Sequence, residues 1–152
     1  MRYLILVLLL FIGHALSAQR MAYKGFPSLV WPKLYDVEFA KGRDDLGEFE
    51  KPIFPPTVRS LQNKTVVLPR YMVPLENGMS SDRIMLSSLP LNACFFCGVG
   101  GPETVVEVHL RKKTPYIEKP IEVKGVLRLN EENPDQMIYV LDDAEVLGTL
   151  DY

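Results

Sequence analysis

The stretch Ile121–Leu129, IEVKGVLRL, decides the fold because apolar and polar residues alternate along almost all of it. Side chains of a β-strand point to two faces in turn, so this alternation predicts a strand with one buried face. Gly125 stands in the middle of the stretch, and a glycine inside a strand often marks the bulge that a tight barrel corner needs. The stretch therefore predicts one strand of a small closed β-barrel.

Four more segments of the chain have the composition of strands, with many β-branched residues. A turn signal, Asn77-Gly78, separates the first two, and Pro69 predicts a bulge or an edge position in the first. Five strands at this length favour an all-β fold with little helix, namely a five-stranded OB-like barrel; an open β-sandwich is the alternative. The four segments are Lys64–Leu75, Arg83–Ser88, Thr104–Leu110 and Met137–Leu141, and Ala144–Leu147 extends the last or adds a short piece.

The N-terminus has the pattern of a secretory signal peptide. Arg2 gives a basic start, Leu4–Ile12 is a short apolar run, and small residues follow up to Ala18. The apolar run is about half of the roughly 20 residues that a membrane span needs, so a retained anchor is disfavoured. We therefore expect residues 1–18 to be removed and the mature protein to be exported to the periplasm, or secreted, as a soluble protein.

The segment 19–59 differs in character from the rest of the chain. Its prolines break any long helix or strand, and Gly42–Glu50 is strongly charged. We predict an irregular N-terminal extension that packs on an OB-like domain spanning residues 60–152. The apolar residues that would anchor the extension are Trp31, Leu34, Tyr35, Val37 and Phe39.

The charge balance argues against binding to nucleic acid. The chain has 17 basic and 19 acidic residues, and the predicted signal peptide removes Arg2 but no acidic residue. Proteins that bind polyanions concentrate Lys and Arg on one surface, and here the single basic cluster is Arg111–Lys113. We therefore expect no nucleic-acid partner, although many OB barrels bind oligonucleotides.

Both cysteines of the chain lie in one glycine-rich loop, as Cys94-Phe95-Phe96-Cys97-Gly98. Two thiolates at this spacing can share one soft metal ion, such as zinc or copper. A closed tetrahedral site needs four ligands, and His109 is the one histidine of the predicted mature chain. In an extended strand Glu103, Glu107 and His109 share a face. The hypothesis is a metal site of Cys94, Cys97, His109 and Glu107, with Glu103 as the alternative carboxylate.

Two other roles for the cysteine pair stay open. An oxidising compartment favours a structural disulfide between Cys94 and Cys97. Thiol–disulfide exchange is the third role, although reactive Cys-x-x-Cys pairs usually begin a helix and glycines follow this pair. The residue directly after Cys97 is not histidine, so c-type haem attachment through Cys-x-x-Cys-His is excluded. We also find no hydrolase motif. A catalytic function is the less favoured class.

Several blocks between Leu61 and Leu147 resemble a family of exported bacterial proteins classed as a domain of unknown function. The blocks are Leu61–Leu68, Arg70–Glu76, Ile84–Ser87, the Cys94–Gly98 loop and Gly101–Val108. The resemblance implies an OB-like fold. A related branch of the family has a Cys-x-His loop and is associated with metal-responsive transport systems, whereas this chain has Phe96 at the histidine position.

The sequence as a whole predicts an exported binding or accessory protein and favours a non-enzymatic function. In the leading hypothesis it holds zinc or copper at the Cys-x-x-Cys loop and serves envelope transport proteins. The alternatives are a thiol–disulfide oxidoreductase and a non-catalytic partner-binding module with a structural disulfide.

Overall fold

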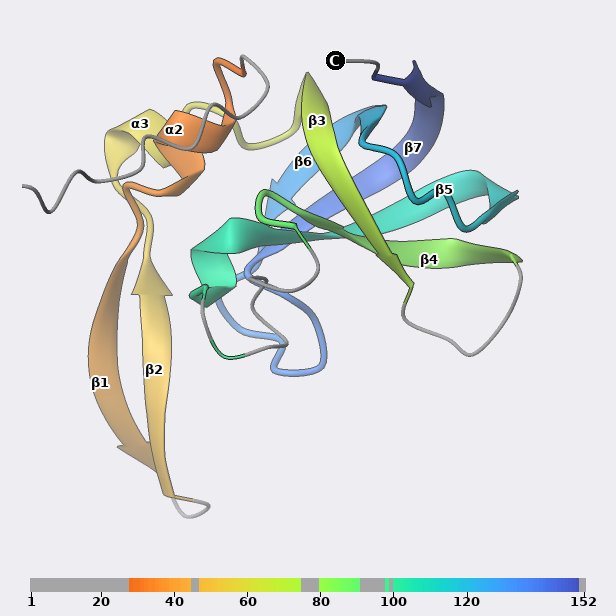
Figure 1. The fold of residues 1–152 in the computed structure, drawn as a ribbon. Coiled ribbons are helices and arrows are strands. Elements are labelled where there is room, and N and C mark those ends of the chain that lie inside the picture. The colour runs from red at the N-terminus through yellow and green to blue at the C-terminus, as the bar shows by residue number, and fades with distance from the viewer. Residues whose placement is uncertain (1–27, 45–46, 75–79, 91–97, 99, 151–152) are drawn as a thin grey trace, which may run out of the picture.

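The computed structural model describes residues 28–44, 47–74, 80–90, 98 and 100–150. These residues are mostly β, with two one-turn helices and one 3-10 turn, as Figure 1 shows. The elements in chain order are α2 (Trp31–Leu34), β1 (Glu38–Asp44), β2 (Gly47–Ile53), α3 (Pro56–Arg59), β3 (Lys64–Pro74), β4 (Ser80–Ser87), η3 (Pro102–Thr104), β5 (Val105–Pro115), β6 (Ile121–Leu129) and β7 (Tyr139–Thr149).

Five strands close into a barrel in the order β3-β4-β5-β7-β6, with β6 pairing back to β3. All neighbours are antiparallel except β5 and β7, which run parallel. This order, with one parallel contact between the third and fifth barrel strands, is the arrangement of an OB fold. The predicted all-β, OB-like barrel is therefore confirmed.

The first barrel strand closes the barrel by changing partner along its length. Lys64–Arg70 of β3 pairs with β6, and Tyr71–Pro74 pairs with β4. Pro69 lies just before this change and keeps its register with Glu122 of β6, so β3 has no bulge there. A strand whose two halves bond to opposite neighbours leaves one side of each half unpaired within the sheet, and proline is tolerated at such a position.

Gly125 lies at an irregularity of the β6–β7 ladder, as its place in the sequence predicts. The register shifts between Lys124 and Val126. A Cβ atom added to Gly125 would lie 2.7 Å from Cγ of Leu141 and 2.9 Å from the backbone oxygen of Asp142. The two strands approach each other there more closely than a side chain would allow.

The N-terminal segment packs against one end of the barrel core through aromatic side chains. Trp31 is fully buried, and its Nε1–H donates to the backbone oxygen of Pro69 at 2.8 Å. The hydroxyl of Tyr139 on β7 donates to the backbone oxygen of Leu34 at 2.7 Å, and the Tyr139 ring lies 5.6 Å from that of Phe54. One hydrophobic core therefore includes both the barrel interior and α2.

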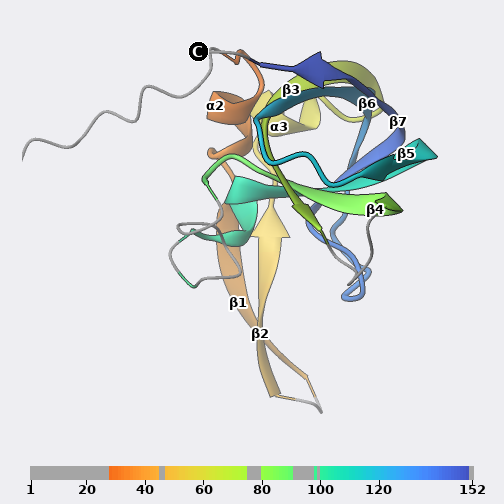
Figure 2. The same cartoon turned by 45° about the vertical axis from the view of Figure 1, so that its right-hand side comes forward.

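Strands β1 and β2 form a two-stranded hairpin that projects away from the barrel, as Figures 1 and 2 show. The sequence pattern did not predict this hairpin, because its residues are mostly charged and lack an alternating apolar face. Most of its described side chains are exposed, and Pro52 is the buried residue of β2. The described charged side chains of the predicted Gly42–Glu50 segment are thus exposed, but its described residues belong to strands.

Three sequence predictions fall outside the described residues, namely the signal peptide at residues 1–18, the Asn77-Gly78 turn and the site at Cys94 and Cys97. Within the part of the chain that the structure describes, no helix has the length and apolar character needed to span a membrane.

Candidate functional site

One group of charged side chains lies on the outer face of the barrel, across four neighbouring strands. Val106 and Val108 of β5 are buried in the core, so the alternate residues Glu107 and His109 point outward. The strand registers bring one charged residue each from β4, β6 and β7 to the same face. We call these five residues the Glu107 cluster: Arg83, Glu107, His109, Arg128 and Asp142.

Glu107 is the centre of the cluster and is 3% exposed. Nη2 of Arg83 donates to its Oε1 at 2.6 Å, and Nε2 of His109 lies 2.8 Å from the same oxygen. The backbone N–H of Met137 donates to the other oxygen, Oε2, at 3.1 Å. A buried carboxylate is costly unless it is paired and hydrogen-bonded, and Glu107 meets both conditions.

His109 connects Glu107 to a second carboxylate. Its Nδ1 lies 2.7 Å from Oδ1 of Asp142, and Oδ2 of Asp142 accepts a hydrogen bond from Nε of Arg128 at 2.8 Å. Neutral imidazole has one N–H, so only the protonated ring donates to both carboxylates. In that state cations and anions alternate through the five side chains.

The surroundings of the two carboxyl groups favour their ionised forms. Burial acts to raise the pKa of Glu107, but hydrogen bonds from His109, Arg83 and the Met137 N–H outweigh it, so this pKa is lowered. Burial also acts to raise the pKa of Asp142, and the contacts with Arg128 and His109 lower it overall. All four carboxylate oxygens accept hydrogen bonds, so the cluster is suited to holding structure and not to abstracting protons.

The cluster fixes residues 130–138, which we call the β6–β7 connection. Besides the Met137 bond to Glu107, Nη1 of Arg128 donates to Oε1 of Gln136 at 3.2 Å. Within the connection, Nδ2 of Asn130 donates to the backbone oxygens of Asn133, Gln136 and Met137 at 2.7 to 3.2 Å. The connection is therefore tied both to itself and to the barrel face.

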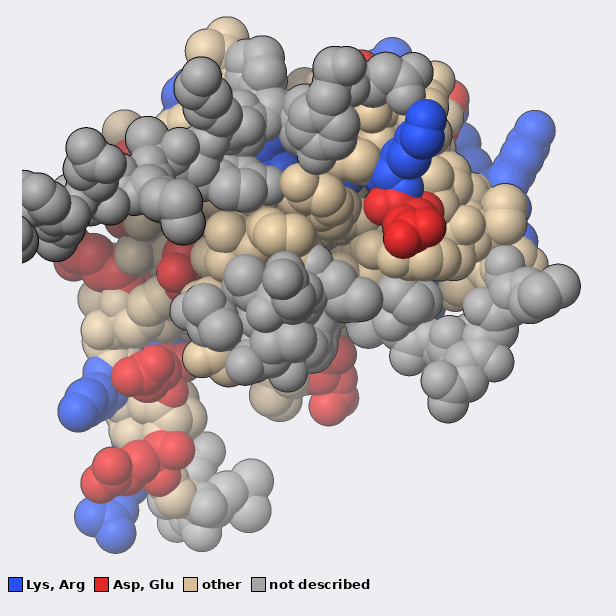
Figure 3. Space-filling view, viewed as in Figure 1, with Lys and Arg blue, Asp and Glu red and all other residues tan. Residues whose placement is uncertain are grey.

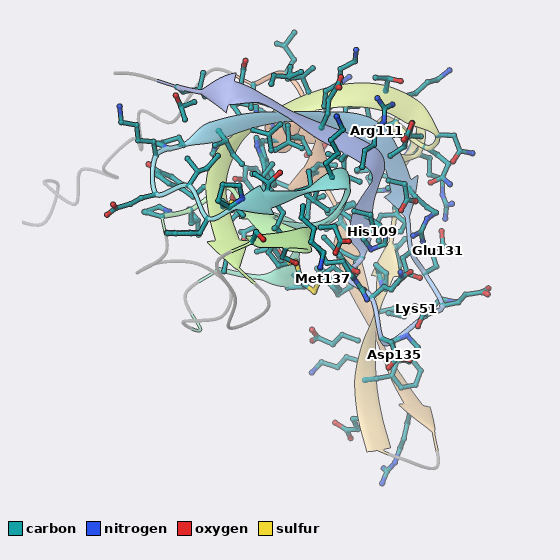
Figure 4. The ribbon with its side chains drawn as sticks, turned by 90° about the vertical axis from the view of Figure 1, so that its right-hand side faces the viewer. Lys51, His109, Arg111, Glu131, Asp135 and Met137 are labelled. Atoms are coloured by element: carbon teal, nitrogen blue, oxygen red, sulfur yellow. The ribbon has the colours of Figure 1, made fainter. Side chains whose placement is uncertain are left out.

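An open groove lies between β2 and the β6–β7 connection and has a volume of about 710 Å³. This volume falls within the range of roughly 300–1,000 Å³ that is typical of ligand sites. Figure 4 shows Lys51, Glu131 and Asp135 at this end of the molecule, where β2 passes the connection. The groove has apolar residues in its lining (Phe49, Pro52, Pro134 and Ile138) and charged ones (Glu48, Glu50, Lys51, Glu131 and Glu132).

The structure brings together two of the four residues that the sequence suggested as metal ligands. Glu107 and His109 share a face and are in contact, as the strand pattern predicts. Cys94 and Cys97 lie outside the described residues. Glu103, the alternative carboxylate, lies in the 3-10 turn η3 and not in an extended strand.

The donors around Glu107 and His109 leave little room for a cation at these residues. Arg83 and His109 both contact Oε1 of Glu107, and both ring nitrogens of His109 face carboxylates. Within the described ranges, no group of three or more His, Cys, Asp or Glu side chains is arranged to hold a metal ion. A metal bound to His109 would have to displace one of its two carboxylates.

Sequence reasoning missed three members of the cluster. Arg83 and Arg128 occupy solvent-facing positions in their strands, where a charged residue is ordinary. Asp142 and Asp143 have the composition of a turn, but both lie in β7, where Asp143 has a φ of +52°. Their common location follows from the strand registers, which no local pattern encodes.

Comparisons with known proteins give one distant likeness. No family model matches the chain, and no curated protein matches it. The crystal structure of a DUF3299 family protein from Pseudomonas aeruginosa PAO1 superposes with a TM-score of 0.49 and 22% identity, covering 64% of this chain and 68% of that one. The name of that family denotes a domain of unknown function.

Proposed function

We propose that the protein is an exported, non-catalytic binding module that holds a partner in the groove between β2 and the β6–β7 connection. The observation that carries this proposal is the groove itself. One of its walls is the exposed strand β2, and the other is the β6–β7 connection, which is hydrogen-bonded to the barrel through Met137. A firmly held wall favours binding because less conformational entropy is lost when the partner docks. The envelope transport proteins suggested by the sequence remain a proposed class of partner.

Site-specific photo-cross-linking in exporting cells tests this proposal. A benzophenone amino acid replaces Phe49 in the groove, and in a matched control it replaces Tyr116; both side chains are about equally exposed, at 44% and 43%. We expect one defined adduct from position 49 and none from position 116. The adduct should weaken when Ile138, on the opposite wall, is changed to Asp.

The identified partner is then purified and its binding to the unmodified protein is measured. Equal cross-linking at both positions, or an adduct that Ile138→Asp leaves unchanged, would argue against a binding groove.

A second candidate function is metal binding at the Cys94–Cys97 loop. The observation that favours it is Gly98, directly after Cys97, which has a φ of +75° and no heavy atom within 4 Å of where a Cβ would lie. This conformation suits glycine, and it allows the turn by which backbone N–H groups approach cysteine sulfurs in metal knuckles.

Native mass spectrometry of the protein isolated without chelator or reductant tests this second candidate. A bound metal ion with both thiols reduced would support it, and Cys94→Ser and Cys97→Ser should each abolish metal occupancy. His109→Ala decides whether His109 is a ligand, because occupancy falls only if it is. A metal-free protein lighter by about 2 Da would indicate a disulfide and exclude the resident metal.

A further inference from the structure

We infer that the groove receives a short, extended, basic segment of a partner protein, which adds as a strand along the outer edge of β2. This inference rests on the proposed binding function and specifies the chemistry of its partner. Addition of a strand to an exposed sheet edge is a recurrent mode of peptide recognition, in which main-chain hydrogen bonds give affinity and side-chain contacts give specificity.

The outer edge of β2 has its backbone groups aimed away from β1. In an antiparallel pair, opposed residues alternate between pairs that exchange hydrogen bonds and pairs that do not. Pro52 faces Phe39 and has no N–H, so this pair is one that does not exchange hydrogen bonds. Glu50 and Glu48 lie two and four residues before Pro52, so their backbone N–H and C=O groups also point away from β1.

A strand that pairs with this edge would thus meet the N–H and C=O groups of Glu48 and Glu50 and the C=O of Pro52. Among hydrogen bonds between described residues, no backbone bond outside the hairpin reaches these three residues. A two-stranded ribbon is marginally stable alone, so a third strand would also stabilise the hairpin. The stretch Gly47–Pro52 matches a partner strand of about six residues.

The charges along the groove favour a basic strand. Four glutamates and one lysine line it, so acidic groups prevail. Arg59 pairs with Glu131 at 2.7 Å, whereas no ion pair between described residues includes Glu48, Glu50 or Glu132 of the lining. Figure 3 shows acidic and basic side chains in turn along the projecting hairpin.

The two faces of β2 suggest an alternating pattern in the partner. Glu48 and Glu50 share one face, while Phe49, which is 44% exposed, lies on the other. Cross-strand neighbours on one face interact directly. A strand that alternates Lys or Arg with apolar residues would place its cations beside the glutamates and an apolar side chain beside Phe49.

A second copy of this chain is the other conceivable occupant, because β1 has Lys41 and Arg43. Its β1 strand is already paired with its own β2, so the contact would join unlike edges of successive copies. Such a head-to-tail contact propagates into a filament unless it closes into a ring. We therefore favour a partner's single strand.

The test is NMR titration of the isotope-labelled full protein with capped model peptides. The first peptide is acetyl-(Lys-Val)₃-amide, the second has Thr in place of Lys, and the third has Glu. Two more Lys-Val peptides carry N-methyl groups on alternate amides, one set for each edge of the strand, because a methylated amide cannot donate. Amide exchange at Glu48 and Glu50 reports strand pairing.

We expect the Lys-Val peptide to shift resonances of β2 and the β6–β7 connection and to slow exchange at Glu48 and Glu50. One methylated peptide should bind and the other should not. The triple variant Glu48→Gln/Glu50→Gln/Glu132→Gln should weaken binding about tenfold, since three exposed charge pairs are each worth about 0.5 kcal/mol. Glu118→Gln, an exposed acid outside the groove lining, is the matched control and should change nothing.

Three outcomes would overturn the inference. Equal binding of the Thr-Val peptide would remove the role of charge, and equal binding of both methylated peptides would remove strand addition. If no peptide binds at millimolar concentration while position 49 still cross-links a partner, the occupant is of another kind and only the inference fails. Concentration-dependent association through the hairpin would assign the edge to a second copy.

Discussion

At the scale of single residues, Gly125 sets how closely β6 approaches β7. The hydrogen of glycine leaves space for Leu141 and for the backbone oxygen of Asp142. A side chain at this position must push against backbone, which cannot move without disturbing the ladder. The same bulge region places Asp142 on the face where it meets His109, so this glycine also contributes to the geometry of the Glu107 cluster.

Gly125→Ala tests this role. Because the added Cβ would lie within 3.0 Å of three atoms, one of them a backbone oxygen, we expect a loss of about 1–3 kcal/mol in the free energy of unfolding. Urea unfolding followed by circular dichroism gives the value.

Gly148→Ala is the matched control, because no atom lies within 4 Å of its added Cβ. It should change stability by less than about 0.5 kcal/mol. If both variants lose the same free energy of unfolding, the close approach of β6 and β7 at Gly125 does not explain the loss.

At the scale of elements, α2 is fixed to the barrel by two long-range hydrogen bonds. Trp31 donates to Pro69 of β3, and Tyr139 of β7 donates to Leu34 at the end of α2. Burial raises the pKa of Tyr139, so its hydroxyl remains a donor at neutral and moderately basic pH. The helix has four residues, too few to be stable alone, so tertiary contacts must hold it.

Tyr139→Phe removes one of these bonds and keeps the ring. The backbone oxygen of Leu34 loses its donor, and we expect a loss of about 1–2 kcal/mol. Hydrogen exchange followed by mass spectrometry should show that the variant exchanges faster than the wild type in residues 31–36, whereas the exchange rates of the barrel strands change less.

Tyr116→Phe is the control, since Tyr116 is 43% exposed. Unchanged exchange near α2 in Tyr139→Phe would mean that apolar packing alone holds the helix.

At the scale of the whole molecule, the Glu107 cluster connects four barrel strands to the β6–β7 connection. The pKa values of Glu107 and Asp142 are both lowered in the folded protein. A carboxyl group with a lowered folded pKa stabilises the fold above its unfolded pKa, and this contribution is lost as the pH falls through the folded pKa. The groove wall should therefore loosen in acid before the barrel unfolds.

Glu107→Gln tests this dependence. At pH 7 we expect a loss of about 1–3 kcal/mol, because Arg83 and His109 lose their common carboxylate. As the pH falls below the ordinary carboxyl pKa near 4, the difference between wild type and variant should shrink, and it should vanish once the pH lies below the lowered pKa of Glu107 in the folded protein. Urea unfolding at several pH values measures the difference.

Glu118→Gln again serves as the control and should leave the pH profile unchanged, because Glu118 is exposed. If the difference in the free energy of unfolding between wild type and Glu107→Gln stayed constant from pH 7 to pH 3, the ionised Glu107 carboxylate would not have the proposed stabilising role.

The sequence by itself determined the barrel strands and favoured a closed barrel over an open β-sandwich. Alternation in Ile121–Leu129 and the β-branched runs specify strands through local side-chain chemistry, and Gly125 marked the irregularity of the β6–β7 ladder. Glu107 and His109 were predictable as neighbours because period two is a local property. The hairpin β1–β2 was not predictable, since its charged residues give no apolar face.

Only the tertiary structure decided which polar residues meet. Arg83, Arg128 and Asp142 come from three strands, and closure of the barrel brings them to Glu107 and His109. The groove likewise joins β2 to a connection about 80 residues later in the chain. Such contacts depend on the register and order of strands, which the global packing of the core selects, and no window of sequence contains that information.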